Sequence, residues 1–195
     1  MGHILENLIT KQIRMGMIKE EDRELYEYGY LIMCEWGFNI VIAALVALIT
    51  GAVQTTVIFL LSIIPLRSFA GGYHASTPGR CAVISNGALL AVILFSEILF
   101  RYNLPVWSLF LCECLLTVWF FCRGIADTPT KPLNDREKKV YGNVAKGCYL
   151  AELVIMAALV GAGKSKGAIT MLLVHVCVVC SIEIAFRKYA DKEKV

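Results

Sequence analysis

Six long apolar segments, separated by shorter polar ones, constrain this chain more than any other feature. They lie at about 30–49, 52–66, 81–100, 105–121, 147–162 and 168–186. A helix that crosses a bilayer needs about 20 apolar residues, with a range of roughly 17–25. The second and fifth segments are short by this measure, so we expect them to be tilted, extended at their ends or partly inserted. The pattern predicts an all-α, polytopic membrane protein with six transmembrane helices.

The composition agrees with this prediction. Of 195 residues, 57% are hydrophobic and 18% are charged, whereas soluble proteins carry roughly a quarter charged residues. This balance argues against a soluble globular enzyme and against a disordered chain. The net charge of +3 is too small an excess to indicate nucleic-acid binding, and no basic run is interleaved with stacking aromatic residues. We expect membrane lipids, and no nucleic acid, among the partners.

The region before the first apolar segment predicts an amphipathic helix. Its apolar residues recur at helical spacing: Ile4, Leu5, Leu8, Ile9 and Ile13. Such a helix can lie in the membrane interface. No cleavable signal peptide is apparent, because residues 1–27 alternate charged and apolar side chains. We expect one integral membrane domain over 1–195, with a cytoplasmic amphipathic region (1–28), a six-span bundle (30–186) and a cytoplasmic tail (187–195).

The basic residues test this division, because they collect on the cytoplasmic side of membrane proteins. If the six spans alternate in direction, sixteen of the nineteen Lys and Arg residues fall on the side that holds both termini and the loops after the second and fourth spans. The opposite side holds only Arg101, Lys164 and Lys166. Both termini and the two larger polar loops are therefore expected to face the cytoplasm.

Several apolar segments contain a glutamate. These residues are Glu35, Glu97, Glu113, Glu152 and Glu183. Carboxylates in a bilayer are costly and often functional, which leaves two interpretations open: a proton relay, or hydrogen bonding between helices or subunits. Glu97 and Glu183 lie within about a turn of a span end, where they can reach lipid headgroups. A small transporter or exporter that uses these carboxylates is the alternative function, although no internal repeat supports it. A non-catalytic membrane partner is a third.

The segment Arg67–Cys81 is the most informative for chemistry. It contains one histidine, His74, and one cysteine, Cys81, seven residues apart. Ser76 or Thr77 can cap a helix that begins at Pro78, where a missing backbone N–H costs least.

If Thr77 is the cap, Cys81 lies in the first turn of that helix. There the helix dipole and Arg80, with or without Arg67, favour the thiolate over the thiol. His74 can then serve as general base or as the imidazolium of an ion pair. Gly71 and Gly72 permit backbone conformations or close approaches that a side chain would block. The alternative is a loop histidine and an interfacial cysteine that are close only in sequence.

The other cysteines indicate packing. Seven of the eight lie in or beside apolar segments, where cysteine behaves as a small hydrophobe. His175, Cys177 and Cys180 have ligand-like spacing, but residues 175 and 177 point about 200° apart around a helix. Helix packing explains them better than a metal site, and we expect neither a metal nor a cofactor.

The segment 67–81 and a stretch of the polar loop after the fourth span together match the pattern of a known family. Arg67, Gly71-Gly72-Tyr73-His74-Ala75 and Cys81, together with Ala126-Asp127-Thr128-Pro129-Thr130-Lys131-Pro132 in a six-span chain of this length, resemble the accessory gene regulator B (AgrB) family. The resemblance covers essentially the whole chain. Members of that family are membrane cysteine endopeptidases of Gram-positive bacteria, which cut a small quorum-sensing propeptide and help to close it into a thiolactone or lactone. The resemblance implies a cell-membrane enzyme, an AgrD-like propeptide as substrate and a homodimer.

The same resemblance implies roles for individual residues. His74 and Cys81 take the catalytic positions, and Arg67 and Gly72 match motif positions that support activity; Gly71 and Arg80 are expected to support the site with them. Thr130 departs from the pattern, since many members have asparagine there.

Two residues of the second loop are candidates for substrate binding or site support. Asp127 could orient His74, although an aspartate before Thr-Pro is more often a turn former. Lys131 and the other basic residues of 123–146 could attract acidic substrate residues or anionic headgroups, or could simply set the topology.

Overall fold

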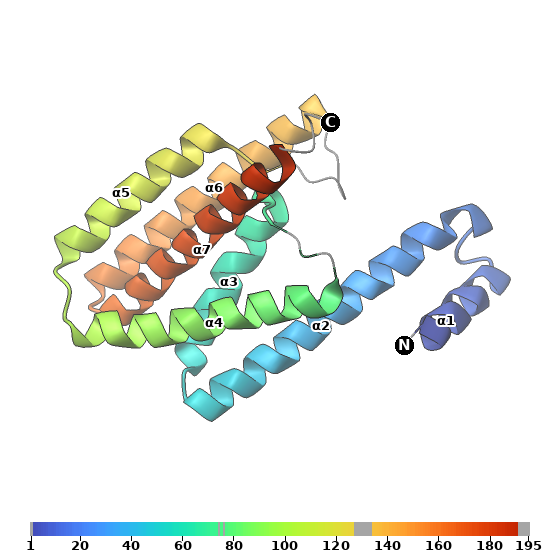
Figure 1. The fold of residues 1–195 in the computed structure, drawn as a ribbon, viewed down its shortest axis with the longest axis horizontal. Helices are drawn as coiled ribbons and strands as arrows, with labels where there is room; N and C mark the ends of the chain where they lie inside the picture. Colours follow the sequence, from blue (N-terminus) through green and yellow to red (C-terminus); the bar gives the residue numbers. More distant parts are fainter. Residues whose placement is uncertain (1, 74, 76, 127–133, 191–195) are drawn as a thin grey trace. The chain divides into compact units, whose positions relative to one another are not determined.

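A computed structural model describes residues 2–73, 75, 77–126 and 134–190, and this part of the chain is almost entirely helical (Figure 1). Its elements are α1 (Gly2–Arg14), the 3-10 turn η1 (Glu20–Asp22), α2 (Arg23–Thr50), α3 (Val53–Ala70), α4 (Pro78–Arg101), α5 (Val106–Arg123), α6 (Asp135–Gly161) and α7 (Ser165–Ala190). The six helices α2 to α7 are long and apolar enough to cross a membrane. The prediction of an all-α, six-span membrane protein is confirmed.

The two short apolar segments belong to helices that extend beyond them. α3 continues past residue 66 to Ala70, which brings Arg67 into its last turn. α6 begins at Asp135, well before the apolar stretch, because Asn134 and Glu137 form a reciprocal capping box. The Glu137 N–H donates to the Asn134 side chain at 2.8 Å, and the Asn134 N–H donates to the Glu137 carboxylate at 3.0 Å. Both short segments are therefore extended at their ends, which is one of the three possibilities that the sequence left open.

The chain divides into two compact units, Met1–Ala43 and Ala44–Val195. In the first, α1 is followed by η1 and the beginning of α2. Ile9 of α1 is buried, and the side chain of Gln12 exchanges hydrogen bonds of 2.7 and 3.0 Å with the Tyr30 hydroxyl of α2. The predicted N-terminal amphipathic helix is confirmed, and its place in the membrane interface remains a prediction.

Helix α7 occupies the centre of the second unit. It contacts α3, α4, α5 and α6, which surround it in Figure 1, and half of its spanning window is buried, the largest share among the spans. Its fully buried residues Val174, Val178, Ile182 and Ala185 recur at helical spacing. Side chains on α7 can therefore reach several other helices.

One end of this unit, which we call the motif end, gathers the end of α3, the start of α4 and the ends of α5 and α7. Hydrogen bonds join Ala70 to Ala126 and Arg67 to Ser181 there. The glutamates near span ends are paired with basic side chains. Glu183 lies 3.0 Å from Arg187 and 3.5 Å from Arg123 at the motif end, and Glu97 pairs with Lys166 and Arg101 at the other end.

Candidate functional site

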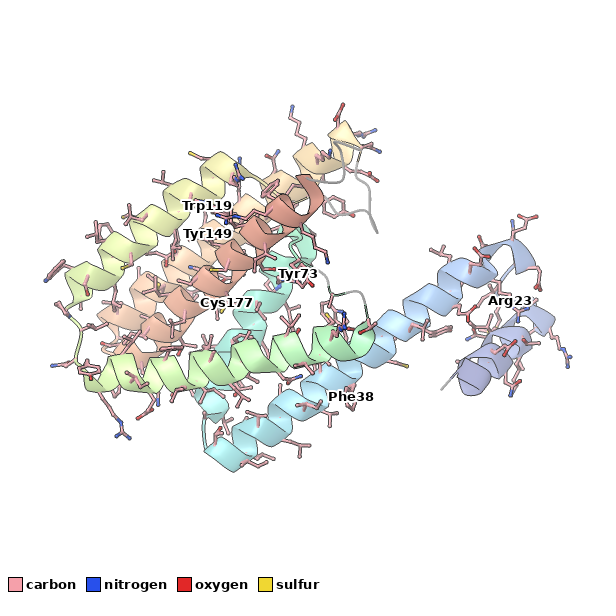
Figure 2. The ribbon with its side chains drawn as sticks, viewed as in Figure 1. Arg23, Phe38, Tyr73, Trp119, Tyr149 and Cys177 are labelled. Carbon is pink, nitrogen blue, oxygen red and sulfur yellow. The ribbon has the colours of Figure 1, made fainter. Side chains whose placement is uncertain are left out.

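Arg67 ties the segment after α3 to α7. Its guanidinium donates to the Ser181 hydroxyl of α7 and, at 2.9 Å, to the carbonyl oxygen of Tyr73. The Tyr73 N–H in turn donates to the Ser181 carbonyl oxygen at 3.0 Å and lies 3.1 Å from the Ser181 hydroxyl. We call Arg67, Tyr73 and Ser181 the arginine clamp; Figure 2 labels Tyr73, just past the end of α3. The clamp fixes the chain immediately before His74 in the sequence.

Gly71 and Gly72 make this close approach possible. Their φ angles are +72° and +125°, in a region that favours glycine. Gly71 and Ala126 form an isolated parallel β-bridge. A Cβ on Gly71 would lie 2.5 Å from the carbonyl oxygen of Ala126. A Cβ on Gly72 would lie 2.7 Å from the Ser181 hydroxyl and 3.2 Å from the Arg67 guanidinium. Both glycines are therefore required by backbone conformation and by space.

Cys81 lies in the first turn of α4. Thr77 is the N-cap: its side chain accepts a hydrogen bond from the Arg80 N–H at 3.4 Å, and Pro78 is the first helical residue. The Cys81 N–H donates to the Thr77 carbonyl oxygen at 3.1 Å. This local geometry follows the expectation for Thr77 rather than Ser76 as the cap. The positive end of the α4 dipole therefore acts on the Cys81 thiol.

A cationic side chain acts on Cys81 as well. The Arg67 guanidinium interacts electrostatically with the Cys81 thiol, while Cys81 itself is only partly buried. Arg80 is exposed on the same helical turn. A thiol near a helix start and an arginine, with access from outside, has the surroundings that favour the thiolate form.

Of the predicted site residues, Arg67, Gly71 and Gly72 lie together at the motif end. Cys81 follows in the first turn of α4 with Arg80, within electrostatic reach of Arg67. His74, Asp127 and Lys131 lie outside the described residues. The bridge between Gly71 and Ala126 joins the first polar loop to the residue that directly precedes Asp127 in the sequence.

Sequence reasoning missed the contribution of Ser181. It is 114 positions from Arg67, in a part of α7 where Glu183 is the only other polar residue between 177 and 186. A lone hydroxyl in a span is a weak signal, because Ser side chains often bond to their own helix. Only the packing of α3 on α7 makes Ser181 part of the arginine clamp.

Sequence reasoning also left two intramembrane glutamates with open interpretations. Glu113 and Glu152 are buried and hydrogen-bonded to His175 of α7. Hydrogen bonding between helices is thus confirmed for these two residues. The sequence pattern associates His175 with Cys177 and Cys180, which lie on the same helix. In the structure, its hydrogen-bond partners are Glu113 of α5 and Glu152 of α6.

The comparisons with known proteins bear on the whole of this arrangement. No curated protein and no solved structure matches the chain. The model of the family described as Accessory gene regulator B matches residues 4–184, a stretch that includes the arginine clamp, the glycine pair, the start of α4 and nearly all of the six spans. The chain therefore belongs to the accessory gene regulator B family.

Proposed function

We propose that this protein is a membrane cysteine endopeptidase that cleaves a short autoinducer propeptide and promotes its closure to a thiolactone. Family membership supports involvement in accessory gene regulator quorum sensing, with an AgrD-type propeptide as substrate. The observation that carries the endopeptidase chemistry is the position of Cys81, in the first turn of α4 and within electrostatic reach of Arg67.

In the proposed first step, the Cys81 thiolate attacks the carbonyl carbon of the scissile peptide bond. The C–N bond breaks, and His74 gives its proton to the leaving amine. The product is a thioester between Cys81 and the N-terminal part of the propeptide. The proposed role of the arginine clamp is to hold Tyr73, and with it the chain that leads into His74, at a fixed place beside α7. Asp127 is the proposed orienting group for His74.

In the proposed second step, a thiol within the bound peptide attacks the thioester carbonyl and gives its proton to His74. The Cys81 thiolate leaves, and the peptide ring closes. One thioester replaces another, so this exchange is close to isoenergetic, and it requires only that water be kept from the acyl-enzyme.

The proposed setting is the cytoplasmic face of the cell membrane of a Gram-positive bacterium. The basic asymmetry of the loops supports this orientation, with both termini and the motif end in the cytoplasm. Acidic residues of the propeptide would meet Lys131 and its basic neighbours in the loop after α5. A homodimer and contacts with membrane lipids belong to the same proposal.

Cleavage in lipid nanodiscs tests this function against the transporter alternative. Nanodiscs enclose no lumen, so transport cannot consume a substrate there, whereas an endopeptidase still cuts it. We expect the purified full-length chain to cleave the propeptide encoded beside its gene and to release a cyclic product, both measured by mass spectrometry. An intact propeptide after prolonged incubation with folded protein would contradict the proposal.

We expect alkylating reagents to modify Cys81 faster than the other seven cysteines at neutral pH. Cys81 lies in the first turn of α4 near Arg67, whereas the other seven lie farther along their helices, and the thiolate is the reactive form. Peptide mapping after brief treatment with iodoacetamide measures the rates. Cys122, exposed in the last turn of α5 at the same end, is the internal control. Equal rates at Cys81 and Cys122 would argue against an activated thiol.

Replacing Arg67 with lysine should weaken cleavage by roughly 10- to 100-fold. Lysine keeps the charge but cannot reach both the Ser181 hydroxyl and the Tyr73 carbonyl with one planar group, and a hydrogen bond from a charged group contributes about 1.5–3 kcal/mol. Arg101→Lys is the matched control, because Arg101 forms an exposed pair with Glu97 at the other end of α4. Equal rates for the two variants would show that the two-pronged contact is not needed.

A further inference from the structure

Four side chains inside the second unit form a hydrogen-bonded cluster that the proposed cleavage does not use. His175 of α7 lies between two carboxylates. Its Nδ1 is 2.8 Å from Glu113 Oε1 of α5, and its Nε2 is 3.1 Å from Glu152 Oε2 of α6. The Tyr149 hydroxyl of α6 donates to Glu113 Oε1 at 2.7 Å. We call Glu113, Tyr149, Glu152 and His175 the intramembrane cluster, because all four lie within spanning helices.

The cluster is closed off from its surroundings. The exposed fractions are 0% for His175, 4% for Glu113 and 6% for Glu152. The Tyr149 ring, labelled in Figure 2, stacks on His175 at 4.4 Å and on Phe120 at 4.6 Å between ring centroids. Water therefore has little access to these groups.

Each carboxylate has one oxygen left over. Glu113 Oε2 and Glu152 Oε1 are buried without a hydrogen-bond partner among the described residues. The neighbouring hydroxyl of Ser62, from α3, faces Glu152. Buried polar atoms are rarely left without a hydrogen bond. These two oxygens therefore indicate that the cluster contains a component in addition to the heavy atoms of its side chains.

Charge balance identifies the missing component. Two ionised carboxylates carry two negative charges, and an imidazolium at His175 cancels one. In the part of the chain that the structure describes, the groups that meet these carboxylates are His175, Tyr149 and the Ser62 hydroxyl, and none is a lysine or arginine. An uncompensated charge inside a membrane is strongly unfavourable. One further proton removes that cost.

The hydrogen-bond pattern indicates where the two protons reside. Glu113 Oε1 accepts from both Tyr149 and His175, as an ionised carboxylate does. Glu152 meets His175 at the longer distance of 3.1 Å, and beside it the Ser62 hydroxyl can accept a hydrogen bond from a protonated carboxyl. Glu152 is therefore the better place for the second proton.

We propose that the intramembrane cluster is a proton-binding site that is filled at neutral pH, with His175 as imidazolium, Glu152 as carboxylic acid and Glu113 ionised. The filled site joins α5 and α6 to α7 as a neutral unit. His175 precedes Ser181 by six positions on α7, so the same unit fixes the part of α7 that carries one side of the arginine clamp. The site does not depend on the proposed cleavage.

Infrared and NMR spectroscopy of the full-length protein in nanodiscs test the proposal. The infrared spectrum at pH 7 is expected to contain the C=O stretch of a buried carboxylic acid, which shifts in D2O. The chain has three histidines, His3, His74 and His175. For NMR, His3 and His74 are replaced by glutamine, so that His175 is the only one that remains. Its ring nitrogens, labelled with 15N, are expected to show the imidazolium form.

Charge balance makes a specific prediction for a series of variants. Glu113→Gln and Glu152→Gln should each abolish the carboxylic acid band and keep His175 cationic, because the remaining carboxylate then neutralises one imidazolium. The double variant should convert His175 to the neutral form. Glu97→Gln is the control and should keep the band, since Glu97 is an exposed carboxylate paired with Lys166 and Arg101.

Three results would overturn the proposal: a wild-type spectrum without a carboxylic acid band, a neutral His175 in the wild type, or a band that survives both single substitutions. Circular dichroism checks that each variant keeps its helix content. The wild-type spectra decide the matter even if a variant fails to fold, and none of these measurements depends on cleavage of a propeptide.

Discussion

Replacing Cys81 with alanine is expected to lower propeptide cleavage by at least about 10⁴-fold, because the proposed reaction passes through a covalent bond to its sulfur and loss of a nucleophile costs on this order. Cys81 is partly exposed in the first turn of α4, and the substitution removes only one sulfur atom. Membrane abundance and helix content should therefore stay near wild type. Quantitative mass spectrometry of substrate and product, normalised to the amount of protein, measures the effect.

The matched control for this experiment is Cys122→Ala. Cys122 is an exposed thiol in the last turn of α5, at the same end of the bundle, so its loss should leave cleavage within about twofold of wild type, as surface substitutions usually do. Cleavage that persists in the Cys81 variant at a rate near that of the Cys122 variant would refute the assignment of the nucleophile.

Replacing Gly72 with alanine is expected to lower cleavage by roughly 100-fold. The added Cβ would lie 2.7 Å from the Ser181 hydroxyl and 3.2 Å from the Arg67 guanidinium, at a φ of +125°. Strained backbone of this kind costs on the order of 1–3 kcal/mol, and the collision would separate the partners of the arginine clamp. Because the clamp holds the chain directly before His74 in the sequence, the loss should appear mainly in kcat. Steady-state kinetics in nanodiscs separate it from a change in KM.

Gly79 provides the control in the same segment. A Cβ on Gly79 would meet nothing within 4 Å, and the residue lies in the first turn of α4. Gly79→Ala should therefore keep the wild-type rate and membrane abundance, since alanine is a better helix former than glycine. Equal activity of the two variants would mean that the close approach at Gly72 has no part in catalysis.

The sequence was sufficient for the features that local rules control. The six apolar segments identified α2 to α7, because each crossing of a bilayer needs a long apolar stretch, although two of the segments were shorter than the helices that contain them. Thr77 and Pro78 identified the start of α4 and so placed Cys81 in its first turn, because capping depends on the residues at the helix end itself.

The start of α6 could not be read from the apolar pattern, although it also has a local cause. The charged stretch from Asp135 to Lys146 looks like a loop when apolar residues alone define a span. The Asn134 capping box nevertheless begins a helix there, so the signal lay in polar residues outside the apolar segment. A search for capping boxes before each span would have found it.

The contacts between side chains of different helices could not be predicted from the sequence, for a different reason. Arg67 and Ser181 meet only because α3 packs on α7, and His175 meets Glu113 and Glu152 only because α5, α6 and α7 come together. Periodicity tells which residues are apolar along a helix, but it does not give the rotation of one helix against another. A single hydroxyl or imidazole within an apolar span therefore reveals its partner only in the folded structure.

The most direct test of the central claim is the isolation of the covalent intermediate. The propeptide is synthesised with alanine in place of its ring-closing residue, so that the acyl-enzyme cannot be resolved by ring closure, and is incubated with the full-length protein in nanodiscs. We predict that peptide mapping finds the N-terminal part of the propeptide bound to Cys81 as a thioester that hydroxylamine releases. Cleavage of this peptide with Cys81 unmodified throughout, or with the adduct on another residue, would contradict the account.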